Sequence, residues 1–229
     1  MDERFSRSAR VIGEDGLQKL NNCSVIVFGL GGVGGAAAES LVRAGVGTIG
    51  IVDKDVVDVT NLNRQLMATE CTIGLPKTQA TADRLLSINP TVKINRYDLF
   101  YLPETADQID LSQYDFIVDC IDNVTAKLEL ISRASELNIP VISSMGTGNK
   151  LHPELLEIAD IKKTSVCPLA RVMRRELRNR GINKLTVVYS KEEPVKTHTS
   201  EPGSMSFVPP VAGYLMTSYV VRTILDSEV

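Results

Sequence analysis

The sequence predicts an α/β fold with a doubly wound, mostly parallel sheet that further strands extend in the C-terminal third. Two observations predict it. Through the first two thirds of the chain, apolar runs of strand length alternate with amphipathic helical stretches, a pattern typical of βαβ units with right-handed crossovers. A glycine-rich loop also separates the first of these strands from the helix that follows, as it does in Rossmann-like folds.

The expected elements follow one another along the chain. An N-terminal helical arm occupies residues 1–22. The parallel strands are expected at Ser24–Phe28, Thr48–Asp53, Val92–Tyr97, Phe116–Asp119 and Pro140–Ser144. Helices are expected at Val33–Ala44, Pro76–Ile88 and Asn123–Leu137. These helices should cover both faces of the sheet.

The alternation changes after Gly148. The later elements are expected to be a strand at Leu155–Ile161, a basic helix at Pro168–Arg180, a strand at Leu185–Ser190 and a closing helix at Val211–Leu225. We expect these strands to extend the same sheet, with a small appended subdomain as the alternative. Residues 191–206 are polar and contain two prolines and a glycine, which predicts a mobile crossover loop. Residues 1–229 should form one domain.

Bulk composition excludes several classes of protein. Hydrophobic residues at 43% and charged residues at 23% indicate a globular chain rather than a disordered one. The four cysteines form no C-x-x-C pair, which argues against a zinc ribbon or a disulfide framework. The first ten residues contain no apolar run, and Phe207–Leu225 carries two prolines and an arginine. We therefore expect a cytoplasmic protein with no membrane contact.

The glycine loop predicts a phosphate-binding site. Gly29, Gly31 and Gly34 have the G-x-G-x-x-G spacing, and Gly32 adds a fourth glycine. Glycines let backbone N–H groups approach a phosphate at the start of a helix, where the helix dipole favours an anion. Asp53 ends the next strand, nineteen residues beyond Gly34, where a carboxylate can accept ribose hydroxyls. Alone, this pattern would favour NAD or FAD.

The residues around the loop favour a triphosphate instead. Asn61, Arg64, Gln65 and Lys77 supply cationic and amide groups just beyond strand ends, although Arg64 and Lys77 have an alternative interpretation as solvated surface charges. No Tyr-x-x-x-Lys pair of a reductase is present. The two histidines, at positions 152 and 198, are expected to be ordinary exposed side chains.

Two carboxylates follow another parallel strand. Asp119 and Asp122 should lie at the same edge of the sheet as the glycine loop, and one of them can hold Mg²⁺ against phosphates. The alternatives are that Asp122 caps the helix starting at Asn123 and that Asp119 is a buried structural carboxylate.

These residues together resemble the ThiF/MoeB/HesA superfamily, the bacterial relatives of ubiquitin-activating enzymes. The matching stretches are Arg4–Arg7, Gly29–Gly34, Asp53–Asp55, Asn61–Gln65, Gly74–Lys77, Asn89–Pro90 and Asp119–Asn123. The resemblance covers nearly the whole chain. It implies a fold that adenylates a carboxylate with ATP and releases pyrophosphate.

The resemblance also implies roles for individual residues. The implied ATP-binding residues are Gly29, Gly31, Gly32, Gly34, Asp53, Asp55, Asn61, Arg64, Lys77 and Asp122. Arg64, Lys77 and Asp122 would be catalytic, with Asp122 positioning Mg²⁺. Arg7 would be catalytic too, reaching from one protomer of a homodimer into the ATP site of its partner. The alternative for Arg7 is an ordinary surface arginine of an N-terminal helix.

The later sequence resembles one subfamily. The stretches Gly146–Lys150, Ala159–Arg171 and Gly203–Pro209 are similar to the tRNA threonylcarbamoyladenosine dehydratases. This implies ATP-dependent dehydration of the modified adenosine next to the anticodon, through an acyl-adenylate. It also leaves a monovalent cation and sulfur-transfer proteins as possible additional components. The alternatives are an adenylyltransferase that activates the C-terminus of a sulfur-carrier or ubiquitin-like protein, and a nucleotide-binding module without turnover.

A tRNA substrate requires a local basic surface, because the net charge is −3. Arg171, Arg174, Arg175 and Arg178 fall at helical spacing and predict one cationic stripe that can bind phosphates. The alternative is a solvated helix face. Cys167 lies just before Pro168 at the expected start of this helix, where a thiolate would be stabilised; a packing role is the alternative.

Overall fold

The computed structural model describes residues 2–196 and 202–226. Its strands form one seven-stranded sheet in the order β3-β2-β1-β4-β5-β7-β6. The strands are β1 (Ser24–Phe28), β2 (Thr48–Val52), β3 (Lys93–Tyr97), β4 (Phe116–Asp119), β5 (Val141–Ser144), β6 (Leu156–Asp160) and β7 (Thr186–Ser190). All neighbours pair in parallel except β6 and β7, which are antiparallel. The predicted α/β fold is confirmed, and the late strands extend the same sheet.

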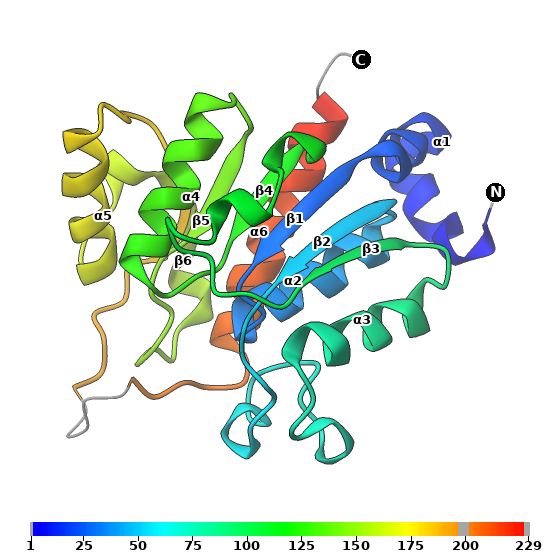
Figure 1. Cartoon of the computed structure of the whole chain (residues 1–229), viewed down its shortest axis with the longest axis horizontal. Coiled ribbons are helices and arrows are strands. Elements are labelled where there is room, and N and C mark those ends of the chain that lie inside the picture. The colour runs from blue at the N-terminus through cyan, green and yellow to red at the C-terminus, as the bar shows by residue number, and fades with distance from the viewer. Residues whose placement is uncertain (1, 197–201, 227–229) are drawn as a thin grey trace.

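Helices cover both faces of this sheet (Figure 1). They are α1 (Ser6–Asn22), α2 (Gly32–Ala44), α3 (Lys77–Ile88), α4 (Val124–Glu136), α5 (Pro168–Asn179) and α6 (Val208–Asp226). One core cluster joins α2, α3 and α6 to the sheet. A second lies under α4, and a third joins α4 and α5 to β7. No described helix combines the length and apolarity that crossing a membrane requires.

The structure shifts some predicted boundaries. Helix α6 begins at Val208, three residues before the predicted start, because Pro209 and Pro210 lie in its first turn, where a missing N–H costs no helical hydrogen bond. The N-terminal arm is helical as predicted, but Gly13 has φ of 75° and kinks α1. The link from β3 to β4 contains only short 3-10 turns, and its Tyr101, Ile109, Leu111 and Tyr114 cover the sheet instead of a helix.

The described parts of the predicted crossover loop are held to the rest of the chain. The buried Glu192 carboxylate accepts hydrogen bonds from the N–H groups of Leu151 and His152, at 2.8 and 3.0 Å. Asn149 exchanges backbone bonds with Val195 and Gly203, at 2.7 and 2.8 Å. Residues 197–201, which include His198, lie outside the described residues. The prediction of mobility therefore stays a prediction for them.

Candidate functional site

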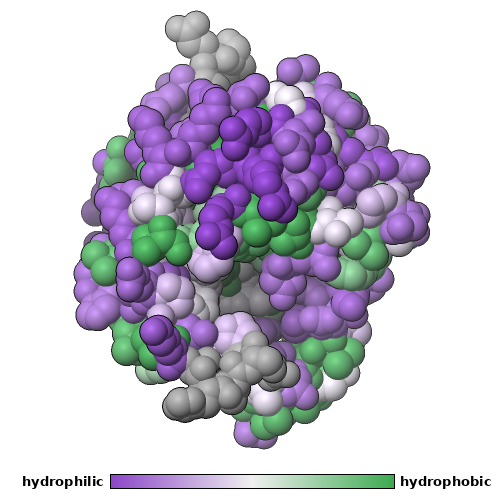
Figure 2. Space-filling model, turned by 90° about the vertical axis from the view of Figure 1, so that its left-hand side faces the viewer, coloured by the Kyte–Doolittle hydropathy of each residue, from purple (hydrophilic) through white to green (hydrophobic). Residues whose placement is uncertain are grey.

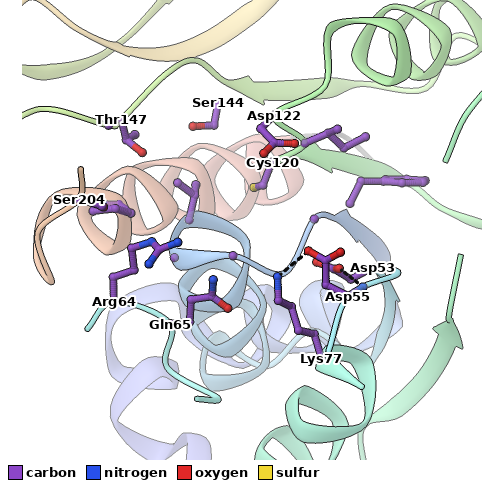
Figure 3. A pocket seen from close by; sticks show the side chains of 18 of the residues that line it. Asp53, Asp55, Arg64, Gln65, Lys77, Cys120, Asp122, Ser144, Thr147 and Ser204 are labelled. Carbon is purple, nitrogen blue, oxygen red and sulfur yellow. Dashed lines mark hydrogen bonds and ion pairs between the residues drawn. The ribbon is translucent and has the colours of Figure 1, made fainter. Parts of the chain in front are cut away.

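A cavity of about 510 Å³ opens at the carboxyl ends of the central parallel strands (Figure 3). Strand β1 lies between β2 and β4, so the chain order reverses here, and doubly wound sheets bind ligands at such a point. One part of the wall is here called the glycine-loop end. It consists of Phe28, Gly29, Gly31–Val33, Asp53–Asp55, Asn61, Arg64, Gln65, Lys77 and Cys120–Asp122. The other part, here called the crossover end, consists of Ser144–Gly148, Leu169 and Pro202–Ser204.

Close backbone packing explains the glycines of the loop. Gly29 has φ of 83°, and a Cβ on Gly34 would lie 1.8 Å from the Gly29 carbonyl oxygen. These two positions therefore accept no side chain without rearrangement. Gly31 differs, because a Cβ there would meet no atom within 4 Å. Gly31 caps α2 without a side-chain hydrogen bond, which leaves the helix N-terminus to a ligand anion.

Asp53 lies in the cavity wall and also braces the loop. Its two carboxylate oxygens accept hydrogen bonds from the N–H groups of Leu30 and Asp55, at 2.6 and 2.9 Å. Each oxygen keeps further acceptor capacity for a ligand hydroxyl. The predicted position of Asp53 beside the loop is therefore confirmed, and the structure adds a second, internal role for its carboxylate.

Lys77 is oriented before any ligand binds. Its Nζ atom lies 2.9 Å from Oδ2 of Asp55, and its side chain is 8% exposed, whereas that of Asp55 is 52% exposed. Lys77 is therefore not a solvated surface charge. Arg64 is half-buried and donates to the Thr60 carbonyl and to Oδ1 of Asn63, at 3.0 and 2.9 Å. Both cations line the cavity, as predicted.

Two amide side chains lie in the same wall. Asn61 is buried, and its Oδ1 atom accepts from the Asp58 N–H at 3.0 Å, which fixes the turn before Arg64. Gln65 is 5% exposed, and its Oε1 atom has no hydrogen-bond partner in the described structure. Unpaired buried acceptors are uncommon. The sequence placed Gln65 in the polar cluster without a role, and only burial reveals that it has an unused acceptor.

The two aspartates at the end of β4 and just beyond it have different surroundings. Asp122 is exposed and lines the cavity. It is not the helix cap, because Asn123 takes that position and accepts from the Ala126 N–H at 3.0 Å. Asp119 is fully buried and lies 2.8 Å from Nζ of Lys127, so its alternative interpretation as a structural carboxylate is correct. Burial raises the pKa of the Cys120 thiol between them, which therefore stays protonated.

Other predicted residues lie outside the cavity wall. Arg7 is an exposed residue of α1 and lines no part of this chain's own cavity. Cys167 is 5% exposed and belongs to the core cluster of α5, which supports a packing role. His152 is exposed and bonded to Glu154 at 2.8 Å, and that bond raises its pKa.

The predicted stripe on α5 is incomplete. Arg171, Arg175 and Arg178 are exposed, but Arg174 is half-buried. Its Nη1 atom donates to the carbonyl and the hydroxyl of Thr164, at 2.8 and 2.7 Å. Arg174 therefore holds the turn before α5, and its assignment to a free cationic stripe is wrong. The sequence spacing gave the helix face correctly but not this bond to a distant turn.

The crossover end was not predicted as a site. Its segments appeared in the sequence only as stretches typical of a subfamily. They are far apart in the chain, and the hydrogen bonds between Asn149 and Gly203 hold two of them together, at 2.8 Å for the Asn149 N–H and 2.6 Å for the Gly203 N–H. In Figure 3, Thr147 and Ser204 lie on the side of Arg64, away from Asp53 and Lys77. The polar side chains of the crossover end thus lie apart from those of Asp53 and Lys77.

The fold and the cavity define a class of protein: a doubly wound nucleotide-binding domain whose glycine loop faces cations and a free carboxylate. The ThiF family model matches residues 5–228, and the chain belongs to this family.

Several known proteins that are similar to this chain are described as tRNA threonylcarbamoyladenosine dehydratases. A tRNA threonylcarbamoyladenosine dehydratase of Bacillus subtilis (strain 168) is 40% identical over an alignment that covers 100% of this chain and 98% of the relative. One of Escherichia coli (strain K12) is 37% identical over 77% of this chain and 66% of its own length. The crystal structure of the E. coli dehydratase TcdA in complex with ATP superimposes with a TM-score of 0.91 at 32% identity, covering 97% of this chain and 94% of that one.

Proposed function

We propose that this protein is an ATP-dependent tRNA threonylcarbamoyladenosine dehydratase. The carboxylate of the modified adenosine attacks the α-phosphorus of ATP, which forms an acyl-adenylate and releases pyrophosphate. A carbamoyl atom of the same side chain then attacks the activated carbonyl, loses its proton and expels AMP. The bond formed closes a ring, and the carboxylate oxygen that leaves is carried by AMP. The substrate thereby loses one water.

The observation that carries the proposal is a cavity with two ends, joined to full-length similarity to dehydratases. The glycine-loop end offers a helix N-terminus and two oriented cations to the phosphates. The crossover end leaves room for the threonylcarbamoyl group. No enzyme nucleophile is required, because ring closure is intramolecular and benefits from proximity. This agrees with the protonated Cys120 and the buried Cys167.

We assign roles on this basis. Asp53 would bind the ribose, and the glycine loop with Asn61, Arg64 and Lys77 would bind the phosphates. Asp55 would act through Lys77, which it orients. Preorganised cations of this kind stabilise charge that develops in the transition state.

Magnesium fits the donors at the glycine-loop end. The described chain has no cluster of three or more side chains suited to a metal, but Mg²⁺ bound to a nucleotide needs only one or two carboxylates besides phosphates and water. Asp122 is exposed in the cavity wall and is not used as a cap. We therefore propose that Asp122 holds Mg²⁺, which would neutralise phosphate charge when bound.

Arg7 would complete the site from a second protomer. It lies outside the cavity of its own chain, which is compatible with action in a homodimer. Mixing Arg7→Ala with Lys77→Ala tests this directly. A heterodimer would contain one site with both residues, so mixing two inactive variants should restore activity. If the mixture stays inactive while heterodimers form, Arg7 does not act in the partner's site.

We also propose that tRNA binds across α5. Leu169, in the first turn of α5, lines the crossover end of the cavity, and Arg171, Arg175 and Arg178 continue outward along the helix. Figure 2 faces the side of the molecule that carries α5, and hydrophilic residues cover much of its upper half. A tRNA held there would present its modified base to the cavity. Such a reaction takes place where tRNA and ATP are, so the proposal implies a cytoplasmic enzyme.

The test is incubation of threonylcarbamoyladenosine-bearing tRNA with the protein and MgATP, followed by nucleoside mass analysis. We expect each converted base to lose one water, with one AMP formed per base. ATP turnover that leaves the base intact would contradict the proposal. Turnover that instead requires a small protein ending in Gly-Gly would indicate an adenylyltransferase.

A further inference from the structure

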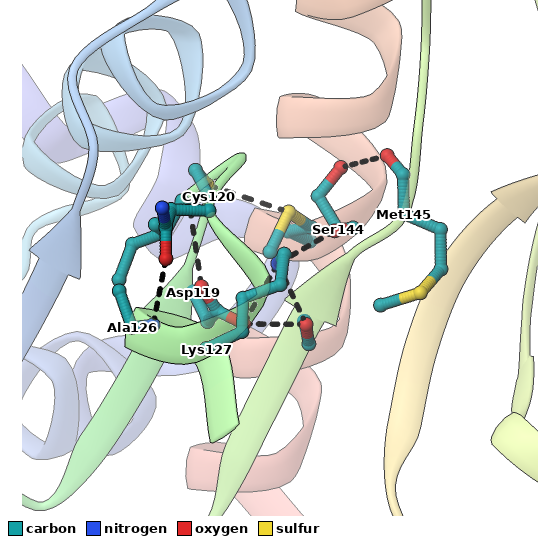
Figure 4. A network of polar contacts seen from close by, with 10 residues as sticks. Asp119, Cys120, Ala126, Lys127, Ser144 and Met145 are labelled. Carbon is teal, nitrogen blue, oxygen red and sulfur yellow. Dashed lines mark hydrogen bonds and ion pairs between the residues drawn. The ribbon is translucent and has the colours of Figure 1, made fainter. Parts of the chain in front are cut away.

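A buried network of polar side chains lies directly behind the cavity wall (Figure 4). Its centre is Lys127 of α4, which is fully buried together with Asp119 and Ser143. The ammonium group donates to Oδ2 of Asp119 at 2.8 Å, to Oγ of Ser143 at 3.1 Å and to the carbonyl oxygen of Ser144 at 2.8 Å. All three of its donors are therefore used.

The bonds of this network lead to the cavity wall on two sides. The second carboxylate oxygen of Asp119 accepts from the Ile121 N–H at 3.1 Å, and Ile121 precedes the exposed Asp122. The Ser144 carbonyl belongs to the segment that starts the crossover end. Lys127 thus joins the loop after β4 to the segment after β5, and both of these segments line the cavity.

Stability alone does not explain such a network. Removing two charges from water costs free energy that their attraction offsets only in part, and replacing a buried ion pair by apolar side chains of similar volume is often neutral or stabilising. The surrounding cores under α4 are apolar. What apolar side chains cannot supply is a directional bond to the Ser144 carbonyl and to the Ile121 N–H.

We infer that Lys127 is a positioning residue for the adenylation step, acting through Asp119 and the Ser144 carbonyl to fix residues 120–122 and 144–148 relative to each other. This inference rests on the proposed function. Groups that orient the ligands of a metal site typically affect activity about 10–100-fold when they are replaced, and misplacing reacting groups by about 1 Å costs up to about 10²-fold in rate. We expect an effect of the same order for Lys127.

The decisive variant is Lys127→Met combined with Asp119→Leu, which leaves no unpaired charge in the core. We expect it to unfold at nearly the wild-type temperature and to bind ATP within about threefold of wild type, while kcat for tRNA-dependent AMP formation falls about 10–100-fold. Amide hydrogen exchange should quicken in residues 120–123 and 144–148 and stay slow in β1 and β4. Arg133→Met is the matched control, since Arg133 carries an ion pair at the other end of α4; it should change neither kcat nor exchange.

Ser143→Ala is the milder second variant, because it removes only the hydroxyl that bridges Lys127 and Asp119. We expect a smaller loss of kcat in the same direction, with the KM for ATP unchanged. A folded double variant with wild-type kcat and wild-type exchange in both segments would overturn the inference. If the double variant does not fold, an unchanged kcat in Ser143→Ala would overturn it. Amide hydrogen exchange is measured without turnover. Failure of the proposed function is therefore a separate result, seen as a lack of dehydration by the wild-type protein.

Discussion

The glycine-loop end of the cavity is lined mostly by residues between Phe28 and Lys77, with the segment after β4 added, whereas the crossover end combines the segment after β5 with Leu169 and residues 202–204. The first end is held by bonds across 23 and 22 residues of sequence, from the Leu30 N–H to Asp53 and from Lys77 to Asp55. The second depends on contacts over long sequence distances, such as those between Asn149 and Gly203. The two ends of the cavity are therefore built by separate parts of the chain, and substitutions can probe each end by itself.

The largest expected effect is at the glycine-loop end. Lys77→Ala and Arg64→Ala should each lower kcat by about 10²–10³-fold, because each removes a preorganised cation worth about 3–4 kcal/mol in the transition state. Asp55→Asn is the control for Lys77, since it keeps the cation and removes only its partner; its effect should be smaller. Steady-state kinetics of AMP formation decides this, and near-normal turnover in either alanine variant removes that residue from the mechanism.

Two glycines offer a matched pair that probes the two ends separately. A Cβ on Gly31 or on Gly146 would meet no atom within 4 Å, and both residues line the cavity. Gly31→Ala should therefore weaken ATP binding by about tenfold or more, because the methyl group occupies space where the backbone approaches a phosphate. Gly146→Ala should leave ATP affinity nearly unchanged and raise the KM for tRNA.

Calorimetric titration with ATP and kinetics with tRNA measure the two effects. Equal loss of ATP affinity in both glycine variants would contradict the division of the cavity into two ends. Neither position has a positive φ, so both variants should fold.

The α5 arginines give a smaller and salt-dependent effect. Changing Arg171, Arg175 and Arg178 to Glu should lower tRNA affinity by about tenfold or more. The slope of log affinity against log salt concentration should also become shallower, by roughly one unit for each phosphate contact that is lost. Charge reversal at Lys93, which lies on the edge strand β3, is the control. Arg174→Glu should instead destabilise the fold by about 1–3 kcal/mol, because it leaves the Thr164 carbonyl without its donor. Unchanged tRNA affinity of the triple variant at moderate salt would exclude this surface.

The smallest effect concerns the scaffold behind the glycine loop. Burial raises the pKa of Glu39, but the hydrogen bonds and charges of Arg84 and Arg43 outweigh burial and hold that pKa below its usual value. A depressed pKa means that the contact stabilises the fold above the usual carboxyl pKa and loses its effect as the pH falls through the lower, folded value. Glu39→Gln should thus cost about 1 kcal/mol at neutral pH, and its unfolding temperature should approach that of wild type in acid.

The division of the cavity into a glycine-loop end and a crossover end also explains which features could be predicted from the sequence. The strands, the glycine loop and the placement of Asp53, Lys77 and Asp122 follow from local patterns, because carboxyl ends of parallel strands meet at one edge. Spacing could not show that Arg174 binds Thr164 or that Gln65 has an unpaired oxygen, since both depend on tertiary packing. The sequence did not predict the crossover end for the same reason, because hydrogen bonds between distant backbone segments leave no periodic pattern in the sequence.

We propose above all that this cavity joins ATP to the carboxylate of a modified tRNA base. The most direct test uses tRNA whose threonylcarbamoyl carboxylate carries a heavy-oxygen label, in a single turnover with MgATP. An acyl-adenylate requires one labelled oxygen to leave with the phosphate of AMP. We predict labelled AMP in equal amount to the dehydrated base. Dehydrated base accompanied by unlabelled AMP would contradict the acyl-adenylate mechanism.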